Sequence, residues 1–169
     1  LDRASLTSSL AGSAFSVTDN FAETTLAVGQ STTFEITLDG SSAGNFSTTL
    51  SFANNDADEN PFGIDLSGEV SAPEIEVRAG DRVLQDGSSV PVDFGATTLN
   101  NVEPQIFTIN NLGGVPLTLG GLDLPAGFAL DGDFPTTVDA NGSANFTINL
   151  VATGLGNFAG EVSFDTNDE

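Results

Sequence analysis

The sequence contains no cysteine, histidine, lysine, methionine, tryptophan or tyrosine. Without cysteine there is no disulfide bond and no thiol nucleophile, and without histidine or lysine the usual general base and Schiff-base amine are missing. Paired carboxylates can hydrolyse glycosides, but such sites need a deep cleft and normally aromatic sugar platforms, for which no Trp or Tyr is present. We therefore predict a protein that is not an enzyme and that requires no cofactor.

Basic charge is almost absent as well. Three arginines stand against 24 acidic residues, so the formal net charge is −21 at pH 7. This charge repels nucleic acid and anionic membrane surfaces. No run of about eighteen apolar residues is present, so we predict no membrane insertion in this segment. An acidic surface stays hydrated in salty water and with divalent cations, which favours an extracellular or cell-surface location; solubility alone is the alternative explanation.

The 13 phenylalanines are the only aromatic residues, and most of them recur at a nearly constant distance. Five are repeated 112 or 113 positions later, in the pairs Phe15 and Phe128, Phe21 and Phe134, Phe34 and Phe146, Phe46 and Phe158, and Phe52 and Phe164. The tripeptide Gly-Asn-Phe at residues 44–46 returns at 156–158. A repeat of this length is close to one immunoglobulin-like sandwich and longer than a solenoid unit, which indicates tandem domains.

Bulky residues occupy alternate positions in several short segments. The alternation is clear at residues 34–38 and 146–150, at 46–52 and 158–164, and at 62–66. This period of two predicts strands with one buried face, and the Gly, Asn, Asp and Ser clusters between them predict turns. With no sustained helical period, we predict an all-β fold of tandem immunoglobulin-like β-sandwiches, about one and a half repeats in all.

The repeat also divides the chain. Residues 1–71 correspond to the back half of a first repeat, and residues 72–169 to a second repeat that lacks its final strand. Because the chain does not begin with Met, we expect its ends not to be natural domain ends. The joint at residues 70–74 is short, so we expect it to hold the two domains at a restricted angle, as in a stiff rod.

Short motifs follow one another in a recognisable order in the second repeat. They are Pro-Glu-Ile-Glu-Val at residues 73–77, Val-Asp-Phe-Gly at 92–95, the segment 107–119 with its Asn-Asn-Leu-Gly-Gly turn, and Gly-Asn-Phe at 156–158. This series resembles the bacterial choice-of-anchor D repeats and the related Hydin-like and abnormal-spindle-like immunoglobulin-type domains. The resemblance implies a seven-stranded sandwich, often in tandem arrays of large secreted or surface-anchored bacterial proteins, and no catalytic residues.

Oxygen-bearing side chains occupy alternate positions in the loop at residues 54–60, a spacing similar to that of Ca²⁺-binding loops. Glu59 stands where an EF-hand loop needs glycine, and no bidentate Glu closes the loop. The second repeat has the start of the same loop after Phe164. The candidate calcium ligands are Asn54, Asp56, Asp58, Asp165 and Asp168. The alternative is a hairpin turn whose Asn and Asp side chains cap their own backbone.

A sandwich without its last strand presents unpaired backbone groups, which recruit a strand from elsewhere. We therefore expect the partners to be neighbouring copies of the chain, through polymerisation by strand complementation, or adjacent repeats. These features favour a structural segment of a large bacterial surface or extracellular protein, such as a fibre, sheath, stalk or adhesin shaft. The alternative is an adhesin module that binds carbohydrate or protein, which an exposed cluster of Phe62, Phe94 and Phe107 would favour.

Overall fold

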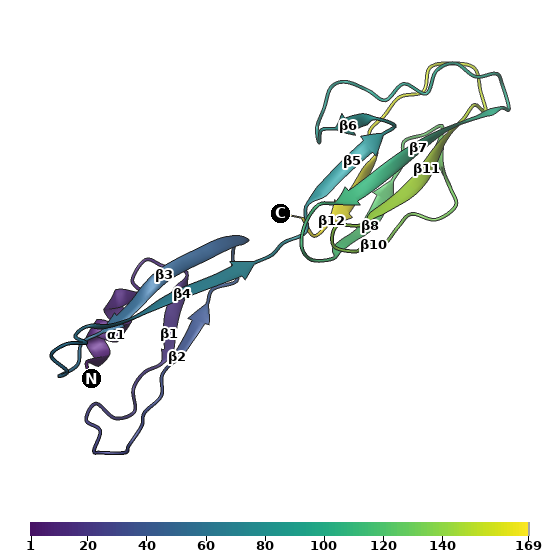
Figure 1. Ribbon diagram of the computed structural model, residues 1–169. Helices are drawn as coiled ribbons and strands as arrows, with labels where there is room; N and C mark the ends of the chain where they lie inside the picture. The colour runs from purple at the N-terminus through teal and green to yellow at the C-terminus, as the bar shows by residue number, and fades with distance from the viewer. Residues whose placement is uncertain (169) are drawn as a thin grey trace. The chain divides into compact units, whose positions relative to one another are not determined.

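The computed structural model describes residues 1–168; Glu169, the last residue of the predicted second repeat, lies outside them. The chain divides into two compact units, Leu1–Val70 and Ser71–Glu169, which we call unit 1 and unit 2 (Figure 1). Both consist of strands in small antiparallel sheets, and residues 1–168 contain one short helix. The prediction of an all-β chain is confirmed, because the regular structure consists mostly of strands with almost no helix.

Unit 1 consists of a helix and two antiparallel strand pairs. Helix α1 (Arg3–Ser9) precedes β1 (Phe15–Asp19) and β2 (Glu35–Leu38), which pair with each other. The second pair is formed by β3 (Gly44–Phe52) and β4 (Phe62–Val70), which are in register over 9 residues. The apolar residues Phe46, Leu50 and Phe52 of β3 and Phe62, Ile64 and Leu66 of β4 stand two or four positions apart, so that they share one face of the strand pair.

The core of unit 1 collects side chains from both strand pairs and from the N-terminal segment. Its buried residues are Leu6, Leu10, Phe15, Phe21 and Leu50. The strand pairs come so close at Gly68 that a Cβ there would lie 2.7 Å from Leu38 Cδ2. Glycine at this position of β4 therefore allows the core to close.

Unit 2 contains the other strands, in two antiparallel sheets. One has the order β6-β5-β7-β11-β9 and the other the order β10-β8-β12. Their bounds are β5 (Ile75–Ala79), β6 (Arg82–Leu84), β7 (Val102–Asn111), β8 (Leu117–Asp123), β9 (Phe128–Asp131), β10 (Thr137–Val138), β11 (Ser143–Val151) and β12 (Ser163–Thr166).

Side chains from both sheets of unit 2 meet in one core. The buried members are Phe107 and Ile109 of β7, Phe146 and Ile148 of β11, Leu117 and Leu119 of β8, and Val138 of β10. They stand at alternate positions of their strands, because successive side chains in a strand point to opposite faces. The period of two in the sequence thus marks the core-facing residues.

The sequence repeat is also a repeat of strand pairing. In unit 1, Phe15 of β1 lies opposite Leu38 of β2. In unit 2, Phe128 of β9 lies opposite Leu150 of β11, and these residues are 113 and 112 positions further along the chain. The same register in both units indicates that the repeated positions are structurally equivalent.

A cluster of three phenylalanine rings is repeated as well. In unit 1 the centroid of Phe21 lies 5.2 Å from that of Phe34 and 5.1 Å from that of Phe52. In unit 2 the equivalent Phe134 lies 5.1 Å from Phe146 and 5.3 Å from Phe164. We call each set the aromatic triad of its unit. Aromatic pairs at these distances add to the free energy gained by burial.

Two segments differ from the sequence-based prediction. The N-terminal residues form α1, which begins where the Asp2 side chain accepts a hydrogen bond from the Ala4 N–H (2.9 Å). The strand expected over residues 158–164 forms only from Ser163 onward. A strand requires hydrogen-bonded neighbours, and within residues 1–168 no strand lies beside 156–162.

Candidate functional site

The acidic loop between β3 and β4 is hydrogen-bonded to its own backbone. The Asn54 side chain accepts from the Asp56 N–H (2.6 Å) and donates to the Glu59 carbonyl (2.7 Å). The Asn54 N–H donates to Asn60 Oδ1 (3.1 Å), and Asp56 and Asp58 are exposed. These bonds are those of a turn that caps its own backbone, the alternative to a calcium-binding loop.

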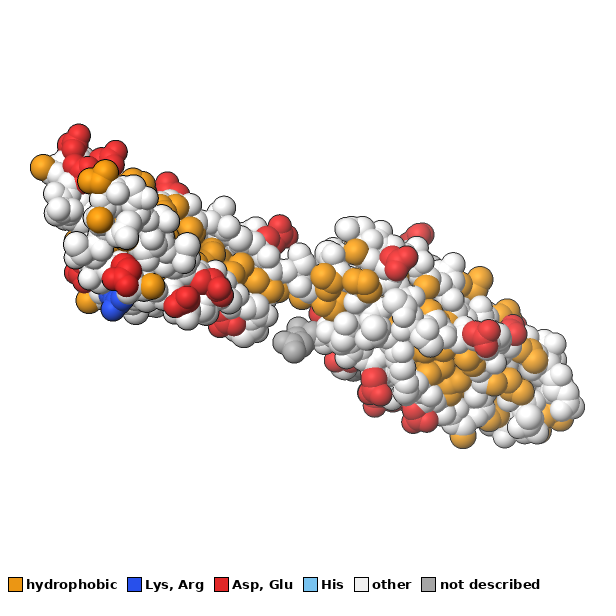
Figure 2. All heavy atoms as spheres, turned by 90° about the horizontal axis from the view of Figure 1, so that it is seen from below, with side chains coloured by type: hydrophobic (Ala, Val, Ile, Leu, Met, Phe, Trp, Pro, Cys, Tyr) orange, Lys and Arg blue, Asp and Glu red, His pale blue; other side chains and the backbone are white. Residues whose placement is uncertain are grey.

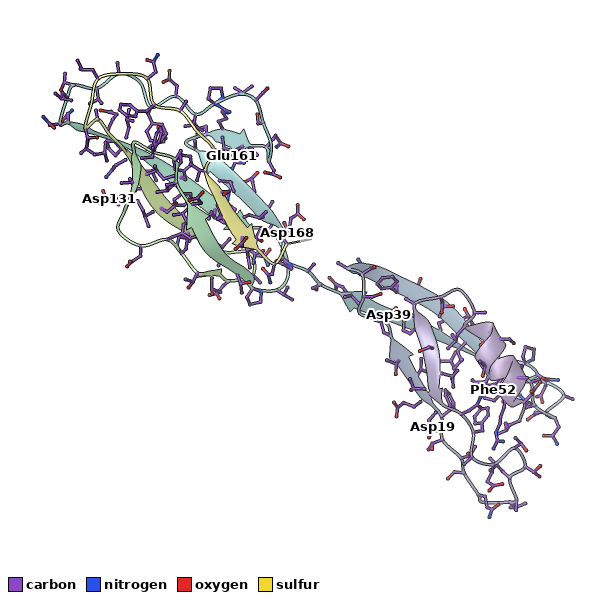
Figure 3. All side chains as sticks on the ribbon, turned by 180° about the vertical axis from the view of Figure 1, so that it is seen from behind. Asp19, Asp39, Phe52, Asp131, Glu161 and Asp168 are labelled. Atoms are coloured by element: carbon purple, nitrogen blue, oxygen red, sulfur yellow. The ribbon has the colours of Figure 1, made fainter. Side chains whose placement is uncertain are left out.

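The acidic segment after β12 is tied to the rest of unit 2. Asp168 Oδ2 accepts a hydrogen bond from the N–H of Ile75, the first residue of β5 (2.8 Å; Figure 3). The Asn167 side chain accepts from the Thr118 N–H (2.8 Å) and donates to the Pro116 carbonyl (3.4 Å). Both side chains therefore hold the end of β12 against β5 and β8.

Asp165 lies within β12, opposite Gly120 of β8. Its carboxylate covers Gly121, where a Cβ would come within 2.3 Å of Asp165 Oδ2. Gly121 also has a φ of 60°, a conformation that side chains other than glycine rarely adopt. The position of this carboxylate therefore depends on the glycine beneath it.

The five candidate calcium ligands fall into two groups. Asn54, Asp56 and Asp58 lie in the loop of unit 1, and Asp165 and Asp168 lie at the end of unit 2. Within the described part of the chain, no three His, Cys, Asp or Glu side chains gather as a metal-binding group would. Calcium binding stays a prediction, which rests on the spacing of oxygen ligands in the sequence.

β5 carries a charged group that the sequence analysis missed. Arg78 donates to both carboxylate oxygens of Glu76 (2.6 and 3.2 Å), and Asn110 of β7 donates to the same carboxylate (2.9 Å). The hydrogen bond from Arg78, followed by that from Asn110, lowers the pKa of Glu76, and Glu76 raises the pKa of Arg78. The Glu-x-Arg spacing is the signal, because residues two apart share one face of a strand.

Asn111 is a buried polar residue at the end of β7, with an exposed fraction of 0%. Its side chain is hydrogen-bonded to five backbone groups, namely the carbonyls of Val115 (2.8 Å), Val138 (3.1 Å) and Asp139 (3.2 Å) and the N–H groups of Gly113 (3.0 Å) and Glu74 (3.3 Å). A buried amide satisfied in this way fixes the conformation around it. The sequence indicated only a turn here, because these partners are distant in the chain.

One edge of β3 is covered by α1. Ser5 Oγ accepts a hydrogen bond from the Ala53 N–H (2.8 Å), and Ser9 Oγ accepts one from the Ser51 N–H (3.1 Å). The two hydroxyls lie four residues apart and share a helix face, whereas the two N–H groups lie two residues apart and share a strand edge. The helix thus satisfies backbone donors that a neighbouring strand would otherwise bind.

The segment of unit 2 that matches β3 has different neighbours. Ser163 and Asp165, the counterparts of Ser51 and Ala53, belong to β12 and pair with β8 instead of a helix. The two segments also differ at the strand edge that faces away from α1 or β8. At this edge β3 is paired with β4, whereas β12 is an edge strand of its sheet. Within residues 1–168, no strand is bonded to this outer edge of β12.

The phenylalanines that would mark a binding surface do not gather at one exposed place. Phe107 is buried, and Phe94 packs against Phe107 and Phe128, with centroids 6.4 and 5.1 Å apart. Phe62 belongs to unit 1 and packs against Phe52 (5.7 Å). The face in Figure 2 instead shows acidic side chains scattered over both units, with hardly any basic ones. Open hollows follow β3 and β4 at residues 45–49 and 65–69.

No family model matches the chain, and neither a curated protein nor a solved structure matches it. The resemblance to choice-of-anchor D and Hydin-like domains therefore stays a prediction from the motifs. In the described residues, no helix is long and apolar enough to cross a membrane.

Proposed function

We propose that the chain is a structural, non-catalytic segment of tandem immunoglobulin-like sandwiches in a large bacterial surface or extracellular protein, such as a fibre, sheath, stalk or adhesin shaft. The observation that carries this proposal is the repeated aromatic triad, together with the repeated register of β1–β2 and β9–β11. What recurs is a core, and not a pocket with convergent polar groups.

The arrangement of unit 2 supports the sandwich interpretation. Ile109 and Ile148 come from one antiparallel sheet, Leu117 and Val138 come from the other, and all four belong to one buried cluster. Two sheets that share a core through alternate side chains are typical of immunoglobulin-like domains. Unit 1 repeats part of this arrangement, because its pair β1–β2 matches the pair β9–β11 of unit 2.

The joint between the units supports a spacing role. β4 ends at Val70, and the Ala72 carbonyl already accepts a hydrogen bond from the Gly114 N–H (3.1 Å) of unit 2. The Glu74 carbonyl accepts one from the Leu112 N–H (2.7 Å). The stretch of chain between the last residue of β4 and the first hydrogen bond of unit 2 is therefore short, and a short linker favours a spacing role.

Small-angle X-ray scattering tests this role. We expect the chain to fit a narrow distribution of inter-unit distances, and a four-residue Gly-Ser insertion after Ser71 to broaden it. The matched control is the same insertion in the loop at residues 40–43, which leaves the distribution unchanged. A native distribution as broad as that of the joint insertion contradicts the spacing role.

Protease treatment of intact cells of the source organism tests the location. We expect the protein to be cleaved without lysis, with a cytoplasmic protein as the protected control. Cleavage only after lysis contradicts an extracellular or surface location.

A further inference from the structure

Strand β3 shows what the repeated segment does when it has a partner. All of its 9 residues pair with β4, and Leu50 in its second half is 1% exposed. Ile64, which lies opposite Leu50, and Leu66 pack against the same core. Pairing with β4 therefore satisfies one edge of the β3 backbone and closes the core at the same time.

The counterpart in unit 2 is open. By the 112-residue spacing of the repeat, β3 corresponds to residues 156–164, of which 156–162 belong to no strand. Val162, the counterpart of Leu50, is 37% exposed. The side chain at this core-facing position is thus buried in unit 1 and exposed in unit 2, whereas the phenylalanines at 46 and 158 are partly buried in both.

The open segment is nevertheless held in place by contacts within unit 2. The ring of Phe158 lies against Gly127, where a Cβ would come within 2.3 Å of its Cδ1 atom. Gly160 lies against Pro125 at a similarly close distance. The hydrogen bonds of the residues after β12 fix the other end. A segment that is already placed loses less conformational entropy when a partner strand binds.

From this comparison we propose that residues 156–166 form a strand-binding edge, and that its partner is an unpaired extended segment with the sequence pattern of β4. Strand addition of this kind uses main-chain hydrogen bonds for affinity and alternate side chains for specificity. The proposal rests on the structural role proposed above and deepens it, because it names the partner that completes unit 2. A second copy of the chain is a poorer source of this segment, since its own β4 is already bonded to β3 along its whole length.

The register of unit 1 defines the chemistry of the partner. A residue like Ile64 would face Val162, and a glycine like Gly68 would face Phe158. Gly68 leaves room for Leu38 in unit 1, and the counterpart of Leu38 in unit 2 is the buried Leu150. The partner therefore needs branched apolar residues at alternate positions, and a glycine at the position that faces Phe158 and leaves room for Leu150.

The test uses the whole chain and a synthetic peptide with the sequence of residues 61–70, followed by hydrogen exchange. We expect exchange at residues 157–164 to slow about tenfold or more at saturating peptide, with unit 1 unchanged. A peptide with Ile64→Asp should bind about tenfold or more weakly, because an apolar contact is lost. A Gly68→Val peptide should also bind more weakly, because its side chain meets the buried leucine.

A variant of the chain supplies the reciprocal control. Val162→Asp should abolish peptide binding and keep the fold, because Val162 is partly exposed, while Val90→Asp at another exposed valine should leave binding intact. Absence of binding at millimolar peptide overturns the proposal, as does protection at β4 in place of residues 157–164. Protection that appears with rising chain concentration alone also overturns it, since a second copy is then the partner. The scattering test does not involve this edge, so the two proposals fail separately.

Discussion

In unit 1 both edges of β3 have hydrogen-bond partners, whereas among residues 1–168 the matching strand β12 of unit 2 is paired on one edge only. The two units otherwise place equivalent phenylalanines in the same triad and pair equivalent strands in the same register. The difference lies in pairing: residues 44–50 form a strand beside β4, and residues 156–162 do not. The alternation of side chains thus determines which residues face the core, while a strand forms only where a partner is present.

The other edge shows that different elements can satisfy one strand. The edge bonded to α1 in unit 1 is bonded to β8 in unit 2. Leu6 of α1 lies 113 residues before Leu119 of β8, and both are buried. Serine hydroxyls on a helix therefore accept hydrogen bonds from the N–H groups of Ser51 and Ala53, whereas a neighbouring strand pairs with their counterparts.

The largest expected effects concern the triads. Phe21 and Phe146 are 3% and 4% exposed, whereas their counterparts Phe134 and Phe34 are only partly buried. We expect Phe21→Ala and Phe146→Ala each to lower the free energy of unfolding of their unit by about 3 to 5 kcal/mol. The counterpart substitutions Phe134→Ala and Phe34→Ala should lower it by less. Urea unfolding followed by residue-resolved NMR separates the units. An equal loss of free energy of unfolding for a phenylalanine and its counterpart would contradict the expectation that the more buried ring contributes more.

Asn111 should come next, because its loss removes hydrogen bonds to five backbone groups. We expect Asn111→Ala to lower the free energy of unfolding of unit 2 by about 3 kcal/mol, with unit 1 unaffected. The exposed Asn101, whose side-chain amide donates to Thr97 Oγ1 (3.2 Å), provides the control Asn101→Ala, which should change little. Comparable losses of stability for the two substitutions would contradict the claim that the hydrogen bonds of the buried Asn111 amide stabilise unit 2.

The helix-covered edge gives a smaller effect, confined to unit 1. Ser5→Ala and Ser9→Ala each leave one N–H of the β3 edge unbonded, and we expect each to cost about 1 to 2 kcal/mol. Ser8→Ala is the matched control, since the Ser8 hydroxyl bonds only within the helix (3.2 Å). Faster hydrogen exchange of Ser51 and Ala53 is the direct readout. If Ser8→Ala has the same effect, helix content and not the edge is responsible.

The Glu76–Arg78 pair should give a pH-dependent effect confined to unit 2. Because the folded state lowers the pKa of Glu76 below its ordinary value of 4.5, its contribution to stability is present above that pH and disappears as the pH falls through the lowered pKa. We expect Glu76→Gln to reduce stability slightly at pH 7, and by progressively less as the pH falls below 4.5. Denaturation curves over this pH range test this, and a difference that does not shrink as the pH falls would contradict it.

Calcium should give the smallest effect. If the loop at residues 54–60 binds Ca²⁺ weakly, half-saturation would stabilise unit 1 by about 0.4 kcal/mol. Amide shifts at Asp56 and Asp58 during titration test this, and Asp56→Asn with Asp58→Asn should remove them. Equal shifts in every acidic loop, in both units, would indicate general screening by the cation.

Much of the fold follows from local pattern, and the remainder depends on distant contacts. The period of two predicted the strands around Ile36 and Ile148, and the 112-residue spacing predicted that the repeated phenylalanines occupy equivalent places in the two units. They did not predict α1, because Leu-Thr-Ser-Ser has no clear helical period and the helix is held by its serine contacts with β3. The burial of Asn111 was equally hidden, since its partners lie as far away as Glu74 and Asp139.

Hydrogen exchange of the whole chain, without any ligand, tests the central comparison most directly. We predict slow exchange for β2 in unit 1 and for β11 in unit 2. In β3 we predict slow exchange for Phe46, Thr48 and Leu50, whose N–H groups face β4, and fast exchange for the matching Phe158, Gly160 and Val162. Equal protection of these two sets would contradict the account, because it would mean that the segment of unit 2 needs no strand partner.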